Sequence, residues 1–192
     1  MSGDLHDFQV VNDFARQTSW LHPIARLYAN DGVVLFGLLI VVAVMLGRRG
    51  GTTALARALL VGAGTLLALA LAQPIVRAVA EPRPYTRLPH ALVLVHRSTD
   101  PSFPSDHATM AGAVAVGLLL VHRRLGLVAA GLAILMAADR VYVGAHYPVD
   151  VLAGLAFGGL VVALVQLAAG PVAALLSRFS HGPLRPLLHA SH

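Results

Sequence analysis

Five stretches of the chain contain no charged residue, and they leave little room for any fold other than a bundle of helices in a membrane. Leu, Val, Ala and Gly dominate these stretches, which cover residues 32–47, 58–76, 108–121, 125–138 and 151–177. A helix needs about 20 mostly apolar residues to cross the hydrocarbon core of a bilayer. The first stretch is marginal and the third and fourth are shorter, so we expect their helices to continue into the flanking polar residues.

The composition of the chain indicates the same fold class. Of its 192 residues, 57% are hydrophobic and 12% are charged, whereas about 25% of the residues of soluble domains are charged. We therefore expect an all-α membrane domain with about five transmembrane helices, formed by residues 1–192 as a single unit, and the sequence is compatible with an oligomer. The chain has no cysteine, which excludes disulfides and thiol catalysis. The net charge of +5 forms no basic face outside the membrane segments, so nucleic acid is not an expected partner.

Residues 1–29 form an arm that differs from the rest of the chain. Between Asp4 and Gln17, apolar side chains recur at helical spacing and charged side chains lie elsewhere, which predicts an amphipathic helix in the membrane interface. The apolar side chains are Phe8, Val11, Phe14 and Ala15. The alternative is a frayed, soluble arm. At the other end, residues 178–192 carry proline and arginine, and we expect a loose cytoplasmic tail there.

The arginines indicate which end of the bundle faces the cytoplasm. The connections after the first and third stretches, and the C-terminal tail, carry arginines and no acidic residue. These arginines are Arg48, Arg49, Arg57, Arg123, Arg124, Arg178 and Arg185. All 9 acidic residues lie towards the opposite end. Basic residues collect in cytoplasmic loops, so we expect the N-terminal arm and the loops that bear three polar clusters to face outwards.

The most informative polar cluster is D-R-V-Y-V-G-A-H-Y-P-V-D, residues 139–150. His146 and Asp150 are four residues apart, and a helix that begins near Pro148 allows them to meet. A carboxylate on one imidazole nitrogen fixes the tautomer and leaves the other nitrogen free to attack. The planar guanidinium of Arg140 suits a pair of phosphoryl oxygens. The alternative is a histidine at a helix end with an arginine that reaches towards the membrane surface.

The second cluster is P-S-F-P-S-D-H, residues 101–107. Pro104 ends whatever precedes it, and Ser105 stands where a helix N-cap belongs. The free backbone donors of that helix start favour an anion. His107 falls in the first turn, where it is able to give a proton to a leaving oxygen. The alternative is a plain capped helix with a histidine at the interface.

The first cluster, E-P-R-P at residues 81–84, is the weakest by itself. Its prolines predict an extended, stiff segment, which holds Arg83 but is equally typical of a structural turn. Its significance comes from position, because five spans place the loops of all three clusters on one side of the membrane. Two histidines, two arginines, a serine and a carboxylate are sufficient to move a phosphoryl group without a metal.

In this order, the clusters resemble the three motifs of the type 2 phosphatidic acid phosphatase superfamily: K-x6-R-P, P-S-G-H and S-R-x5-H-x3-D. They correspond to Arg83-Pro84, residues 104–107 and residues 139–150, and the resemblance covers about residues 76–160. More narrowly, E-P-R-P-Y, S-F-P-S-D-H-A-T and R-V-Y-V-G-A-H-Y-P-V-D-V-L-A-G resemble the bacitracin-resistance-type undecaprenyl-diphosphate phosphatases. Those bacterial enzymes remove the terminal phosphate of the isoprenoid diphosphate, so that the lipid carrier is reused in peptidoglycan synthesis.

The chain departs from the family pattern at three positions. Val76 stands where the family has its lysine, with Arg77 next to it but out of register by one residue. Asp106 replaces the glycine of the second motif, and Asp139 replaces the serine of the third. The resemblance implies a terminal phosphate held by Arg83, Arg140, Ser105 and the amide of Asp106 or His107, with Arg77 as the candidate substitute for the lysine.

The resemblance also implies the chemistry. His146 attacks in line and becomes a phosphohistidine, Asp150 orients it, and His107 protonates the departing phosphate and later activates water. The arginines supply the positive charge, so no metal or other cofactor is expected. The expected substrate is a polyprenyl diphosphate among the membrane lipids of the bacterial cell (inner) membrane, with the site of this multi-pass protein on the extracytoplasmic side.

Three alternatives stay open. In the first, the chain is a phosphatase for a different lipid, namely phosphatidic acid, phosphatidylglycerophosphate or a prenyl-linked sugar phosphate. In the second, the enzyme is a phosphotransferase that passes the phosphate to a sugar lipid, although the chain offers no obvious acceptor domain. The third belongs to a different class of protein: the chain is then a non-enzymatic transporter or scaffold whose polar loops line a pore.

Overall fold

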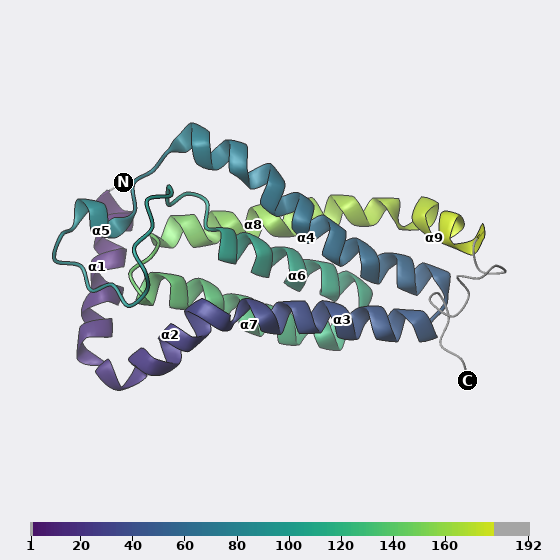
Figure 1. Cartoon of the computed structure of the whole chain (residues 1–192), viewed down its shortest axis with the longest axis horizontal. Helices are drawn as coiled ribbons and strands as arrows, with labels where there is room; N and C mark the ends of the chain where they lie inside the picture. Colours follow the sequence, from purple (N-terminus) through teal and green to yellow (C-terminus); the bar gives the residue numbers. More distant parts are fainter. Residues whose placement is uncertain (1, 179–192) are drawn as a thin grey trace.

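Helices account for all of the regular structure in residues 2–178, the part of the chain that this computed structural model describes. Figure 1 shows their arrangement. In chain order they are α1 (Ser2–Gln17), the 3-10 turn η1 (Ser19–Leu21), α2 (His22–Asp31), α3 (Val33–Arg49), α4 (Thr52–Val79), α5 (Pro84–Arg87), α6 (Asp106–Val121), α7 (Arg123–Tyr142), α8 (Pro148–Val165), η2 (Gln166–Ala168) and α9 (Ala169–Arg178). The predicted all-α class is confirmed. Of the expected C-terminal tail, residues 179–192 lie outside the described residues.

The five predicted spans coincide with α3, α4, α6, α7 and the run from α8 to α9. Three helical segments are long and apolar enough to cross a membrane: Thr52–Arg87, Arg123–Tyr142 and Pro148–Arg178. A fourth is the pair formed by α2 and α3, which bends by 51°. The remaining helix, α6, has only 16 residues, because it begins at the polar second cluster and ends just before His122. As expected, α6 and α7 include the polar residues beside their apolar stretches.

The short helix α6 lies at the centre of the bundle, in contact with α3, α4, α7 and α8. Glycines allow α6 and α8 to approach almost backbone to backbone. A Cβ atom added at Gly112 of α6 would lie 2.7 Å from the Cα of Leu155, and one added at Gly158 of α8 would lie 2.8 Å from the carbonyl carbon of Thr109. Small residues are the usual means by which membrane helices pack closely.

The N-terminal helix α1 lies across one end of the bundle (Figure 1), so the predicted helix is present and the alternative of a frayed arm is wrong. Its predicted apolar face is only partly buried on protein. Phe8 and Ala15 are fully buried and Val11 is half-buried, but Phe14 is 53% exposed. Asn12 is buried instead, since its side-chain amide donates to the carbonyl of Leu92 at 2.8 Å and accepts from its N–H at 2.9 Å. The buried face of α1 therefore packs on protein.

The close approach of α6 and α8 gives a prediction for stability. In the Gly158→Ala variant the new methyl group meets the backbone of α6, with the nitrogen of Ala113 only 3.0 Å away. Overpacking of this kind costs about 1–3 kcal/mol, so we expect the midpoint of thermal unfolding in detergent to fall by roughly 3–10 °C.

The matched control is Gly131→Ala in α7, where the added methyl group has nothing within 4 Å. Alanine is a better helix former than glycine by about 0.5–1 kcal/mol, so this variant is expected to keep or slightly raise the unfolding temperature. Equal unfolding temperatures for the two variants would contradict the close contact between α6 and α8.

Candidate active site

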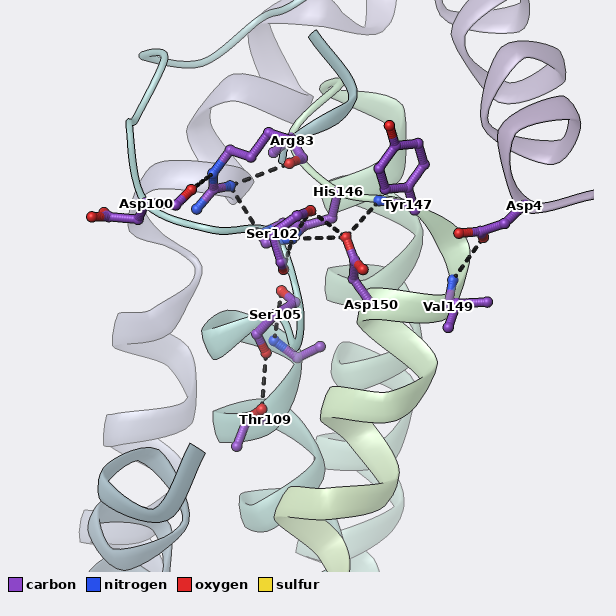
Figure 2. A network of polar contacts seen from close by, with 12 residues as sticks. Asp4, Arg83, Asp100, Ser102, Ser105, Thr109, His146, Tyr147, Val149 and Asp150 are labelled. Carbon is purple, nitrogen blue, oxygen red and sulfur yellow. Dashed lines mark hydrogen bonds and ion pairs between the residues drawn. The ribbon is translucent and has the colours of Figure 1, made fainter. Parts of the chain in front are cut away.

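The three polar clusters meet at the end of the bundle that is covered by α1 (Figures 1 and 2). Arg83 is the N-cap of the short helix α5, and its Nη1 lies 3.2 Å from Nε2 of His146. Ser105 is the N-cap of α6, and its N–H donates to the carbonyl of Asp150 at 3.1 Å. Residues more than sixty positions apart in the sequence therefore form one site.

The connector between α7 and α8 fixes the place of His146. Gly144 adopts a left-handed conformation with φ of 80°, which glycine accepts without steric cost. The chain then folds back, and the N–H groups of Ala145 and His146 donate to the carbonyl of Arg140 at 3.1 and 3.3 Å. The arginine of the third motif and its histidine are thus joined through the backbone.

The ring of His146 is 3% exposed and has partners on both nitrogens. Its Nδ1 lies 2.9 Å from the carbonyl oxygen of Ser102 and 3.4 Å from Oδ2 of Asp150. Since a carbonyl only accepts hydrogen bonds and a guanidinium only donates them, Nδ1 carries the proton. The Nε2 lone pair accepts from Arg83.

The charge state of His146 follows from its surroundings. Burial lowers the pKa of His146 from 6.5 to about 4. The hydrogen bond that the ring donates to Asp150 raises this pKa, and the charges of Arg140 and Arg83 lower it. An ordinary histidine has a pKa near 6.5, so this ring stays neutral well into the acidic range. A neutral imidazole with one free lone pair is the form required of a nucleophile.

Asp150 is 1% exposed and is held by donors from two segments. Its Oδ2 accepts from the backbone N–H of Tyr147 at 2.9 Å and from the hydroxyl of Ser102 (Figure 2). The first contact is part of a capping box at the start of α8. Pro148 stands in the first turn of this helix, which confirms the predicted helix start. A buried carboxylate needs such partners, because an unpaired one is costly.

Two guanidinium groups supply positive charge beside the imidazole. Arg83 is half-buried, and its side chain donates to the carbonyls of Asp100 at 2.9 Å and Ala145 at 3.2 Å. Arg140 is 7% exposed, with Nη1 3.4 Å from the carbonyl of Ala29. Among the described residues its buried Nε has no hydrogen-bond partner. Neighbouring cations with unused donors suit a doubly charged phosphoryl group.

The start of α6 contributes the remaining predicted residues. Ser105 is fully buried, and its Oγ accepts from the N–H of Ala108 at 3.5 Å, so its own hydrogen is available for donation. His107 is half-buried in the first turn of α6, two residues after the N-cap whose N–H donates to the carbonyl of Asp150. The side chain of Asp106 is exposed and turns to α4.

Arg77 is not brought into this network. It is exposed in the last turn of α4, and it takes part in none of the hydrogen bonds or ion pairs found within residues 2–178. Val76, at the position of the family lysine, is 9% exposed. The polar side chain that α4 does present to the site region is Gln73, whose Nε2 lies 3.3 Å from Oδ1 of Asp106.

Ser102 is the main contributor to which the sequence analysis assigned no role. It is fully buried, and it contacts both His146 and Asp150. In the sequence it is one small residue of the run P-S-F-P, and a serine between prolines is typical of an ordinary turn. The available signal was that Ser102 lies in the second cluster and begins the run S-F-P-S-D-H-A-T.

Comparisons with known proteins agree with this geometry. Residues 57–170 match the PAP2 superfamily. The chain is 30% identical over 159 residues to the undecaprenyl-diphosphatase BcrC of Bacillus subtilis, which covers 82% of this chain and 77% of that protein. It is 41% identical over 113 residues to the decaprenylphosphoryl-5-phosphoribose phosphatase of Mycobacterium tuberculosis, over 58% of this chain and 61% of that protein.

The fold has a solved counterpart. The crystal structure of a transmembrane PAP2-type phosphatidylglycerolphosphate phosphatase from Bacillus subtilis superposes with a TM-score of 0.65 at 24% identity, over 88% of this chain and 86% of that one. Shared sequence over most of the chain, the shared membrane fold and the three motifs gathered at one end of the bundle lead to the same conclusion. The chain belongs to the PAP2 superfamily and is a PAP2 phosphatase.

Proposed function

We propose that this phosphatase removes the terminal phosphate of undecaprenyl diphosphate or a similar polyprenyl diphosphate, through a phosphohistidine on His146. The observation that carries the proposal is the set of contacts around that ring. Nδ1–H is held by a carbonyl, a carboxylate stands beside it, and Nε2 faces a guanidinium. Similarity to an undecaprenyl-diphosphatase along most of both chains supports the choice of substrate.

In the proposed complex the terminal phosphate is bound by Arg83, Arg140, the hydroxyl of Ser105 and the first amides of α6. Phosphate oxygens are stronger acceptors for a guanidinium than a neutral imidazole is. Arg83 therefore turns from Nε2 to the phosphate when the substrate binds, which uncovers the lone pair. The N-terminal end of α6 adds the favourable field of its helix dipole.

The reaction then runs in two displacements. The Nε2 lone pair of His146 forms a bond to the terminal phosphorus, and the bond from phosphorus to the bridging oxygen breaks. His107 gives its proton to that oxygen, so the polyprenyl monophosphate leaves. His107 next takes a proton from water, whose oxygen attacks the phosphohistidine and releases inorganic phosphate. The arginines stabilise the charge on the equatorial oxygens in both steps, and Asp150 stabilises the positive ring, so the scheme needs no metal.

A second candidate substrate is a prenyl-linked sugar phosphate. It is favoured by the 41% identity to a decaprenylphosphoryl-5-phosphoribose phosphatase, a higher value over a shorter part of the chain. The same nucleophile and the same arginines serve either substrate, because both present a terminal phosphate on a polyprenyl lipid. The two differ in the leaving group, which is a phosphate in one and a sugar hydroxyl in the other.

We further propose that the site faces the extracytoplasmic side of the cell membrane, with α1 lying at the membrane interface. The end of the bundle opposite the site carries the turn from α3 to α4, with Arg48 and Arg49 beside it, and the turn from α6 to α7, with Arg123 and Arg124 (Figure 1). Basic loops of this kind mark the cytoplasmic side.

The choice of substrate is tested by phosphate release from a panel of lipids, with purified protein in detergent and EDTA. The panel holds undecaprenyl diphosphate, a decaprenyl phosphoribose phosphate, phosphatidic acid and phosphatidylglycerophosphate. We expect kcat/KM to be highest for the diphosphate by about tenfold or more, because phosphate is a better leaving group than an alcohol. A higher value for the sugar phosphate would select the second candidate, and loss of activity in EDTA would contradict the metal-free scheme.

The assignment of the nucleophile and the phosphate clamp is tested by His146→Ala and Arg140→Ala. Loss of the nucleophile is expected to lower kcat by about a thousandfold or more, and loss of the buried guanidinium by about a hundredfold or more. The control is His122→Ala, since the ring of His122 caps α7 at the opposite end, with Nδ1 3.4 Å from the N–H of Leu125. Full turnover by the His146 variant would exclude it as the nucleophile.

A further inference from the structure

Ser102 lies in the segment between α5 and α6 and is held in place from several directions. It is fully buried, and its backbone N–H donates to the carbonyl of Glu81 at 2.7 Å. Its carbonyl and hydroxyl then point to His146 and Asp150 of the third motif, 44 and 48 positions further along the chain (Figure 2). Ser102 thus joins the second cluster to the first at Glu81 and to the third at His146 and Asp150.

The backbone carbonyl of Ser102, more than the carboxylate, determines the tautomer of His146. Nδ1 lies 2.9 Å from the carbonyl oxygen and 3.4 Å from Oδ2 of Asp150. Strong N–H···O hydrogen bonds have lengths of about 2.7–3.2 Å, so the carbonyl is the better acceptor for the Nδ1 proton. The carboxylate beside it is left to act mainly through its charge.

The hydroxyl of Ser102 controls how strongly that charge acts. It donates to Oδ2 of Asp150, the same oxygen that faces the imidazole and accepts from the N–H of Tyr147. Each donor to a carboxylate disperses part of its negative charge and reduces its pull on a neighbouring cation. The hydroxyl also limits the movement of Oδ2 towards Nδ1.

We propose that Ser102 is a positioning residue of this phosphatase: its carbonyl holds His146 in the tautomer with a free Nε2, and its hydroxyl keeps Asp150 from over-stabilising the protonated, inactive ring. The inference rests on the proposed function, because it assigns Ser102 a role towards the proposed nucleophile. The hydroxyl touches no reacting atom, so its removal changes the readiness of His146 rather than the binding of substrate.

Four charged or titratable groups face His146 from the elements around it. They are Asp150 of α8, Arg83 at the start of α5, Arg140 of α7 and His107 of α6. None of them is altered when Ser102 is replaced. The ionisation of the substrate is the same for every variant. A change in the acidic limb of the pH profile, measured with one substrate, therefore reports the link from the Ser102 hydroxyl to the imidazole, through Asp150 and through its own 3.4 Å contact with Nδ1.

The test is the pH dependence of kcat/KM for Ser102→Ala beside the wild-type protein. Without the hydroxyl, Oδ2 has one donor fewer and favours the protonated ring more strongly. The midpoint of the acidic limb should therefore rise, by about 0.5–1 pH unit for the loss of one hydrogen bond. At neutral pH the ring is neutral in both proteins, so we expect kcat and KM to change much less there than on the acidic limb.

Two further variants make the result specific. Ser98→Ala is the matched control, because its partly exposed hydroxyl donates to the carboxylate of Asp100 on the same segment, and its acidic limb should match the wild type. Ser102→Cys keeps the size of the side chain with a weaker donor, so its midpoint should lie between wild type and Ser102→Ala. If Ser102→Ala does not fold, the cysteine variant carries the test.

The inference is overturned if the acidic limb of the Ser102 variants keeps the wild-type midpoint, even if their activity falls. A purely structural role would lower the amount of active protein without moving the midpoint of the limb. A failure of this kind is distinct from a failure of the proposed function. The latter would show as a wild-type protein that releases no phosphate from either polyprenyl lipid, whereas the inference alone fails when the wild type is active and the limb does not move.

Discussion

The burial of two ionisable side chains at the end of an apolar bundle governs the rest of this structure. His146 is 3% exposed and Asp150 is 1% exposed, and uncompensated charge is costly in such a place. The imidazole therefore stays neutral, and the carboxylate collects donors from Ser102 and Tyr147. The same hydrogen bonds fix the direction of the Nε2 lone pair. The contacts that satisfy burial are thus also the contacts that aim the proposed nucleophile.

That arrangement depends on close helix packing. A Cβ atom at Gly154 of α8 would lie 2.7 Å from the carbonyl oxygen of Ser105 and 3.0 Å from the Cβ of Ala108. Only a residue without a side chain lets the start of α6 approach α8 so closely. The approach allows the 3.1 Å hydrogen bond from Ser105 to the carbonyl of Asp150, which ties the second motif to the third. The fold therefore sets the geometry of the proposed phosphate site through small residues that take no part in the chemistry.

Features that depend on neighbouring residues could be read from the sequence. The N-cap at Ser105, the helix start at Pro148 and the contact of His146 with the acid four residues later all follow from local spacing. Features that depend on long-range packing could not. The contacts of Ser102 join segments 44 and 48 residues apart, and no periodicity reports on them. The role of Arg77 was suggested by a family pattern and stays a prediction, since the residue is exposed in the last turn of α4.

In the proposed reaction the polar clusters form one anion site, and His146 becomes covalently phosphorylated there. The most direct test mixes the enzyme with undecaprenyl diphosphate that is labelled in its terminal phosphate. The reaction is stopped rapidly without acid, and the labelled residue is located by peptide mapping. We predict an adduct that is stable in base and labile in acid, located on His146 and accumulating in a His107→Ala variant. Label on a different residue, or steady turnover of a His107→Ala variant with no labelled protein at any time, would contradict the account.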